Sequence, residues 1–221
     1  MTVLHRAHRI AISSALALAC APAFAALVIN GDFEAGNSGF TSGHTFVPYA
    51  SGAMLAAGET RYTVGTAPLD THAYWVNPAG STGNMLIVNG ATAPDVLVWQ
   101  QAITGATAGT PYSLSASFAD IAPCCGNPAS VRFSVDGSPI GAANTVNSTT
   151  FAGYETTFVA PAASFTLALY NSQTAAYGND FAVDNVQVAA VREPHEWAMM
   201  LMGLGLVGCV ARRRGQQVTA A

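Results

Sequence analysis

Side chains that commonly perform catalysis are few in this sequence, and none of them forms a recognised catalytic motif. The chain has no Gly-x-Ser-x-Gly turn, no His-Glu-x-x-His zinc motif and no phosphate-binding P-loop. His44 and His72 are the only histidines in residues 26–191. Glu59 and Glu155 would have to flank one cleft to hydrolyse a glycosidic bond, and nothing in the sequence brings them together. We therefore expect a non-enzymatic protein, with a secreted glycan-active enzyme as a remote alternative.

Aromatic rings offer a second kind of chemistry, because a sugar ring can stack on a flat apolar face. Tyr74 and Trp75 lie in a polar, turn-rich stretch, residues 70–78, whose pattern does not indicate burial. They are the candidate glycan-binding residues, and packing within the loop is the alternative for both. Trp99 lies in an alternating segment and is expected in the core.

Cys124 and Cys125 are adjacent, and they are the only cysteines in residues 26–191. Such neighbours can form a vicinal disulfide, pair with other molecules, or remain as two thiols. Metal binding is not expected, because no other cysteine is at hand and His44 and His72 are distant in sequence. We expect the pair to be a structural feature of a loop.

The charge of the chain excludes one class of partner. Residues 26–191 carry ten acidic side chains but only two basic ones, Arg61 and Arg132, and the whole chain contains no lysine. A protein that binds nucleic acid needs clustered lysine and arginine to displace the counterions of the phosphates. Nucleic-acid binding is therefore excluded, and the polar surface must consist mainly of uncharged residues, as is common in extracellular β-domains.

Short segments of β type recur between turn signals along residues 26–191. In one of them, bulky residues alternate with polar ones from Tyr112 to Phe118, and another leads into Asp136-Gly137, a strong hairpin signal. Long runs of helical period are absent. This pattern predicts a single all-β domain, a two-sheet β-sandwich. The strands are expected in residues 27–29, 44–49, 61–64, 85–88, 96–103, 112–118, 131–135, 165–169 and 181–188, with a further apolar position at Phe158.

The first 25 residues have the features of a cleavable signal peptide. Basic residues precede an apolar run from Ile10 to Ala19, which is too short to span a bilayer comfortably. Ala23 and Ala25 supply the small side chains that signal peptidase requires, so we expect cleavage between Ala25 and Ala26. Lipidation of Cys20 is the weaker alternative.

The C-terminal end predicts a membrane anchor. Residues 197–211 carry no charge, and a helix of this length covers about 22 Å. That is short of the hydrocarbon core, but flanking residues and local thinning can absorb the mismatch. Arg212, Arg213 and Arg214 follow at once and would hold this end in the cytoplasm, leaving the domain on the other side.

This tail resembles the PEP-CTERM sorting signal. The resemblance is carried by Glu193 and Pro194, by a short span opening at Trp197, by the segment 203–206, and by the arginine cluster. It implies export, a stay in the inner membrane of a Gram-negative bacterium, and cleavage by an exosortase. Arg192 stands where the motif has its first proline. A single-pass anchor that is never processed is the alternative.

Residues 27–34 and 178–186 resemble the opening and closing strands of galactose-binding-like jelly rolls, notably carbohydrate-binding modules. The resemblance implies a jelly-roll β-sandwich over residues 26–191, in which the first and last strands lie near one another. It also implies a structural Ca²⁺ held by Glu34 and Asp184, with Asp32 as a weaker candidate, since Ca²⁺ prefers oxygen ligands. The alternative is that these carboxylates only accept hydrogen bonds at turns and edges.

These observations together predict an exported, surface-sorted protein of the cell envelope or of an exopolysaccharide or biofilm matrix. We expect it to bind a glycan, and its expected partners are signal peptidase, an exosortase-like enzyme, the membrane and an extracellular polysaccharide. A structural or adhesive matrix protein without a defined ligand is the alternative.

Overall fold

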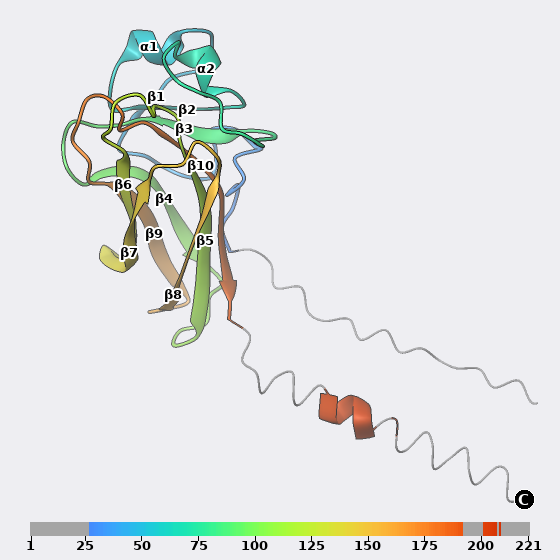
Figure 1. The fold of residues 1–221 in the computed structure, drawn as a ribbon. Helices are drawn as coiled ribbons and strands as arrows, with labels where there is room; N and C mark the ends of the chain where they lie inside the picture. Colours follow the sequence, from blue (N-terminus) through green and yellow to red (C-terminus); the bar gives the residue numbers. More distant parts are fainter. Residues whose placement is uncertain (1–26, 192–200, 207, 209–221) are drawn as a thin grey trace, which may run out of the picture.

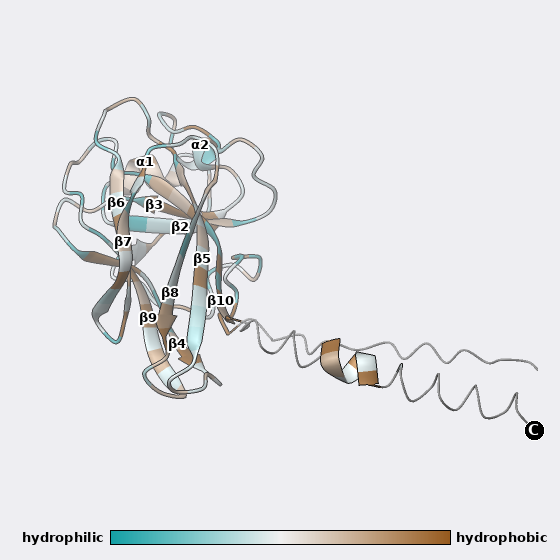
Figure 2. Ribbon diagram, turned by 60° about the horizontal axis from the view of Figure 1, so that its bottom comes forward, coloured by the Kyte–Doolittle hydropathy of each residue, from teal (hydrophilic) through white to brown (hydrophobic). Residues whose placement is uncertain are grey.

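Two packed β-sheets form the body of the protein in the computed structural model, which describes residues 27–191, 201–206 and 208 (Figure 1). Apolar segments lie mainly on the strands, and polar ones are frequent in the loops (Figure 2). The elements, in chain order, are β1 Thr45–Phe46, α1 Ala53–Ala57, β2 Arg61–Gly65, α2 Pro68–Thr71, β3 Met85–Asn89, β4 Val96–Thr104, β5 Pro111–Asp120, β6 Ala129–Val135, β7 Ser138–Val146, β8 Ala152–Val159, β9 Ser164–Asn171 and β10 Phe181–Ala190.

The larger sheet has the order β1-β2-β3-β10-β5-β8, and the smaller sheet has the order β4-β9-β6-β7. All pairings are antiparallel except that of β1 with β2. The main core lies between the two sheets and includes Trp99, Phe133 and Phe181, all fully buried. The two-sheet sandwich and the core position of Trp99 are therefore confirmed.

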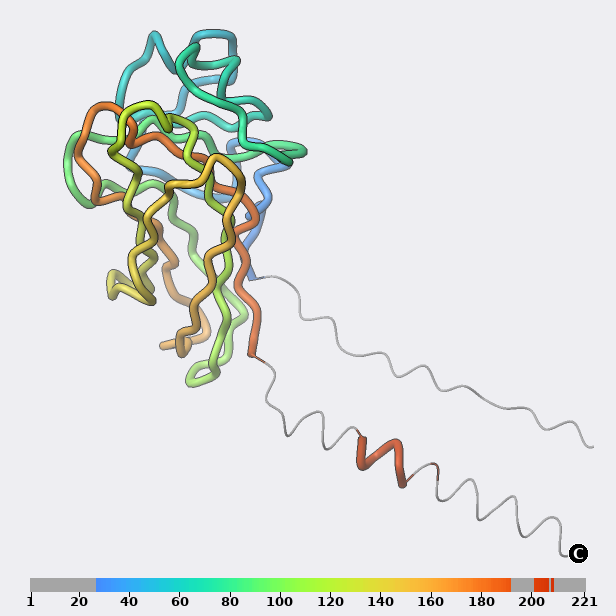
Figure 3. Tube along the Cα trace, in the orientation of Figure 1, coloured from blue at the N-terminus to red at the C-terminus, as the bar shows by residue number. Residues whose placement is uncertain are grey.

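Strand β3 is buried on both of its faces. Leu86 and Val88 point into the main core, whereas Met85 and Ile87 join a second, smaller cluster with Met54 of α1. A strand that is covered on both sides has a continuous apolar sequence instead of an alternating one. The segment with α1 and α2 thus caps the outer face of the larger sheet at one end of the sandwich (Figures 1 and 3).

The opening and closing segments of the domain are adjacent, as the jelly-roll resemblance implies. The amide of Leu27 donates to the carbonyl of Val188, and the amide of Val186 donates to the carbonyl of Gly31. A side chain at position 31 would collide with the Val186 carbonyl, so only glycine permits this approach. Strand β10 bulges between Asp184 and Gln187, and Asn185 there has a φ of 54°, which asparagine tolerates better than most residues.

Several strand predictions differ from the structure in detail. Residues 27–29 form bends instead of a strand, and the segment 44–49 is reduced to the two residues of β1. Strand β7 was missed because its sequence, which contains Pro139 and Gly141, is exposed along most of its length and lacks a clean alternation. The hairpin turn at Asp136-Gly137 is confirmed by the pairing of β6 with β7.

The predicted signals at the two ends fall almost entirely outside the described residues. This holds for the cleavage site at Ala23, Ala25 and Ala26, and for the sorting-motif residues Arg192, Glu193, Pro194, Trp197, Arg212, Arg213 and Arg214. Within the predicted span, residues 201–206 and 208 are described and helical. Among the described residues, no helix has the length and apolar content that a membrane crossing requires.

The burial of β3 on both faces makes a testable prediction for Ile87→Ala. Ile87 is fully buried in the second cluster, so its truncation should lower the free energy of unfolding by about 2–5 kcal/mol. Leu69→Ala, at a side chain with 46% exposure, should change it by less than about 0.5 kcal/mol. Urea denaturation of both variants measures the difference, and equal values would contradict a covered outer face of β3.

Candidate functional site

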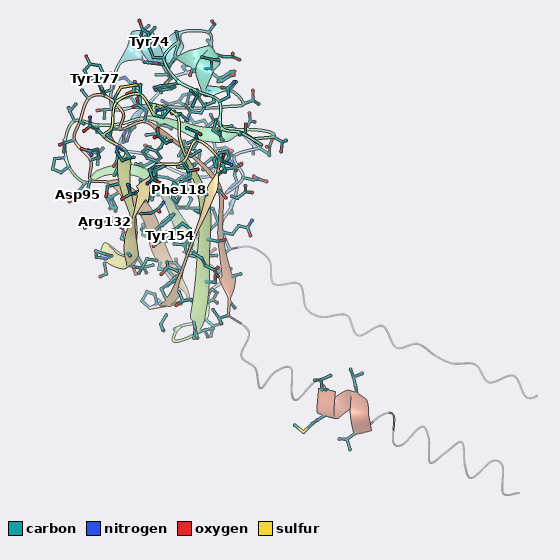
Figure 4. The ribbon with its side chains drawn as sticks, viewed as in Figure 1. Tyr74, Asp95, Phe118, Arg132, Tyr154 and Tyr177 are labelled. Atoms are coloured by element: carbon teal, nitrogen blue, oxygen red, sulfur yellow. A yellow bond between two sulfur atoms is a disulfide. The ribbon has the colours of Figure 1, made fainter. Side chains whose placement is uncertain are left out.

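A pocket of about 470 Å³ opens at the end of the sandwich that carries α1 and α2. Its walls come from α1 and the residues after it, from the segment around Trp75, from the β5–β6 loop and from the β9–β10 loop. Tyr74 and Tyr177 both lie at this end (Figure 4). Their side chains are 75% and 74% exposed, so two large aromatic residues border one pocket and are open to solvent.

The buried carboxylate of Asp180 accepts two hydrogen bonds at the base of this pocket. One of its oxygens accepts the indole N–H of Trp75 at 3.0 Å, and the other accepts the backbone N–H of Gly90 at 3.0 Å. The neighbouring Asn179 donates to the carbonyls of Ala91 and Gln173. These two residues therefore join the Trp75 segment, the β3–β4 loop and the β9–β10 loop at one point.

A chain of aromatic contacts leads from this point to the pocket rim. The ring of His72 stacks on Trp75 with a centroid distance of 4.3 Å and an angle of 16°. The ring of Tyr74 meets His72 edge-on at 5.9 Å. Burial lowers the pKa of His72 and so favours its neutral imidazole. Tyr74 is thus an exposed ring supported from behind by packed rings.

Tyr177 and a disulfide between Cys124 and Cys125 also line the pocket. The side-chain amide of Asn127 donates both to the carbonyl of Cys125, at 3.0 Å, and to the carbonyl of Tyr177, at 3.2 Å. The β5–β6 loop and the β9–β10 loop are therefore held together beside the pocket.

Acidic groups dominate the polar lining of the pocket. Glu59 and Asp180 line it, whereas Arg61 and Arg132, the basic side chains of the described residues, do not. Burial raises the pKa of Asp180 to about 6, and the charges of Asp120 and Glu59 act in the same direction. Asn89, at the end of β3, contributes an uncharged amide to the lining.

The structure separates the two aromatic residues that the sequence placed together. Tyr74 is exposed at the pocket rim, as a ligand platform requires. Trp75 is only 2% exposed, and one of its faces is covered by His72, which favours the packing alternative for this residue. Tyr177 was missed, because its stretch of small residues gave no signal and only the fold brings it to Tyr74's pocket.

The candidate calcium ligands lie near one another but do not form a complete site in the structure. Burial raises the pKa of Asp184 to about 6, and the nearby charges of Glu34 and Asp32 add to this effect. Glu34 accepts the backbone N–H of Asn84, and Asp184 accepts that of Asn185. Among the described residues, no group of three or more side chains is arranged to hold a metal ion. Calcium binding stays a prediction.

The remaining candidates lie elsewhere. Glu155 lines a second, polar pocket of about 330 Å³ formed by β5, β8 and β10, so it does not share a pocket with Glu59. The one aromatic residue that lines this second pocket, Tyr154, packs against Phe133 at 5.7 Å. His44 is buried, with Nδ1 3.0 Å from the carbonyl of Leu97. Neither pocket in the described part of the chain contains a paired catalytic set.

Comparison with known proteins gives a likeness of fold. No protein-family model and no curated protein matches the chain. The CBM22-1–CBM22-2 tandem domain of Paenibacillus barcinonensis Xyn10C is 18% identical, with a TM-score of 0.50 over 79% of this chain and 47% of the tandem. The sugar-binding C-terminal domain of EclA is 24% identical over 45% of this chain and 69% of that chain, with a TM-score of 0.39.

A third similar structure is the cyclase Fisc from Fischerella sp. TAU, solved in complex with an indole compound. It is 18% identical over 59% of this chain and 74% of the cyclase, with a TM-score of 0.44. The likeness to the CBM22 tandem agrees with the β-sandwich described above. A likeness at 18% identity concerns the fold alone and does not assign an activity.

The buried Asp180 predicts how stability depends on pH. Its folded pKa of about 6 lies above the ordinary value of 3.8, so the folded protein keeps a proton that the unfolded chain releases. The resulting stabilisation is complete below about pH 4 and is lost as the pH rises through 6. Between pH 4 and 7, the unfolding free energy of Asp180→Asn should therefore fall by about 2 kcal/mol less than that of the wild type.

Urea denaturation across this pH range measures the slope. Asp70→Asn, at an exposed carboxyl that accepts a hydrogen bond from Tyr49, is the matched control for the substitution. An unchanged slope in Asp180→Asn would show that Asp180 is not the group that titrates.

Proposed function

We propose that this domain binds a glycan in the pocket beside α1, with sugar rings packed on Tyr74 and Tyr177. The observation that carries the proposal is the exposure of both rings, about three quarters each, at the rim of one concave site. Two exposed aromatic rings beside one concave site can both contact the same ligand, and sugar rings present apolar faces that fit them. The packed support behind Tyr74 limits the entropy that binding would cost.

The charges of the pocket select among glycans. Since Glu59 and Asp180 line the site and no arginine does, the pocket repels uronate and sulfate groups and accepts uncharged sugars. The side chains of Glu59 and Asn89 are the groups suited to hydrogen bonds with sugar hydroxyls. The ligand class is therefore a neutral oligosaccharide or polysaccharide.

Two further observations support a binding module over a catalyst. The fold resembles that of a carbohydrate-binding tandem at a TM-score of 0.50. In addition, Asp180 is already engaged by Trp75 and Gly90, which leaves Glu59 as the one carboxylate of the pocket that is exposed. Canonical glycoside hydrolysis uses two carboxyl groups across the scissile bond.

Substitution of the two tyrosines tests the proposal. Tyr74→Ala and Tyr177→Ala should each weaken binding to xylan or β-glucan by about tenfold, which corresponds to about 1.4 kcal/mol for a lost aromatic contact. Affinity electrophoresis in gels that contain each polysaccharide measures the retention. Alginate, a polyuronate, should not retain the wild type. Tyr170→Ala, on the smaller sheet outside the pocket, is the control and should bind normally.

Two other binding results would contradict the proposed function or the proposed site. Absence of wild-type retention by all neutral polysaccharides would favour a structural or adhesive matrix protein without a defined ligand. Retention that survives both tyrosine substitutions in folded proteins would locate the binding site elsewhere, with the polar pocket on β5, β8 and β10 as the next surface to test.

We further propose that the protein acts outside the cytoplasm, as an exported component of the cell surface or matrix. The support is in the sequence alone, in the signal-peptide features and in the PEP-CTERM-like tail with its arginine cluster. The composition of the domain, poor in charge and free of lysine, is consistent with this location.

Intact-mass analysis of the exported protein tests this proposed location. We expect a form that begins at Ala26 and, in a host that has an exosortase, ends near Pro194. A host without the enzyme should yield a membrane-bound form that retains residues 197–214. A mass that includes residues 1–25 would contradict export through signal peptidase.

A further inference from the structure

The disulfide between Cys124 and Cys125 is exposed, and both residues line the glycan pocket. A disulfide usually stabilises a protein by closing a loop of chain, and its effect grows with the length of that loop. This one joins adjacent residues and therefore closes almost no loop. Its contribution must be local, through the two sulfur atoms that it presents and through the backbone that it fixes.

The disulfide is also in close contact with the loop that carries Tyr177. A Cβ atom at Gly178 would lie only 3.0 Å from the Cβ of Cys125, so the two backbones approach as near as a glycine allows. Gly178 also has a φ of +85°, a backbone conformation that residues with a side chain rarely adopt. Asn127 bridges the carbonyls of Cys125 and Tyr177. The position of Tyr177 thus depends on the loop that the disulfide fixes.

We propose that the Cys124–Cys125 disulfide is a ligand-contacting wall of the pocket and that glycan binding depends on its oxidised state. This inference rests on the proposed glycan-binding function. The two sulfurs form a rigid, polarisable and uncharged surface, suited to the C–H face of a sugar ring. Tyr74 lines the same pocket, so its ring and the two sulfurs can contact one neutral sugar.

Reduction would remove both contributions of the disulfide. A dithiol reductant attacks one sulfur, breaks the S–S bond through a mixed disulfide, and leaves as a cyclic disulfide while Cys124 and Cys125 become two thiols. The thiols can then separate, which frees the backbone of residues 124 and 125 beside Gly178. Tyr177 loses its fixed position while the sandwich core stays intact.

The test compares the wild type with the double variant Cys124→Ser/Cys125→Ser, using xylohexaose and cellohexaose as probes in calorimetric titrations. The double variant, and the wild type after treatment with a dithiol, should each bind at least tenfold more weakly. Reoxidation should restore the wild type, and the dithiol should not affect the double variant further. Far-ultraviolet circular dichroism checks that every sample is folded.

A second measurement tests direct contact between ligand and disulfide. Saturating oligosaccharide should slow reduction of the wild-type disulfide at least fivefold, because a bound sugar covers the sulfurs. Full affinity in the reduced or serine forms, or an unchanged rate of reduction in the presence of bound ligand, would overturn the inference. In that case the loss of binding in Tyr74→Ala and Tyr177→Ala would still uphold the proposed function, whereas a wild type that binds no probe would overturn both.

Discussion

A single buried carboxylate links segments that are distant in the sequence and that line the pocket. Asp180 accepts the indole of Trp75 and the amide of Gly90, and both partners lie far from it in the sequence. Burial of an acidic group is unfavourable unless hydrogen bonds compensate for the lost water. Here the two donors compensate in part, and the raised pKa reflects what remains. The arrangement exchanges some stability at neutral pH for a fixed geometry of three loops.

The site has a rigid floor and a rim that is open to solvent. Strand β3 ends at Asn89, and strand β10 begins just after Asp180. Both residues line the pocket, and the pairing of the two strands sets their positions. At the rim, the ring of Tyr74 packs against His72, and the backbone carbonyl of Tyr177 accepts a hydrogen bond from Asn127. Loops on a fixed scaffold are where one fold acquires different ligands.

The sequence predicted the sandwich well because its inner strands alternate clearly, as β5 does, and because Asp136-Gly137 marks a hairpin. It predicted the site less well. The burial of Trp75 depends on its hydrogen bond to Asp180, which lies 105 residues further along the chain. Tyr177 and the cysteine pair gave no sign of proximity, since only the topology brings the β5–β6 and β9–β10 loops together. Local patterns reveal strands, whereas a pocket built from loops depends on contacts between distant residues.

Strand β10 begins immediately after Asp180 and runs away from the pocket to the opposite end of the sandwich (Figures 1 and 3). Its ten residues span about 33 Å. A pull between a ligand held in the pocket and the chain beyond Val191 would therefore act along this strand. Because β10 pairs with β3 over Phe181–Val183 and with β5 from Phe181 to Ala190, the force would shear these ladders instead of opening one from its end.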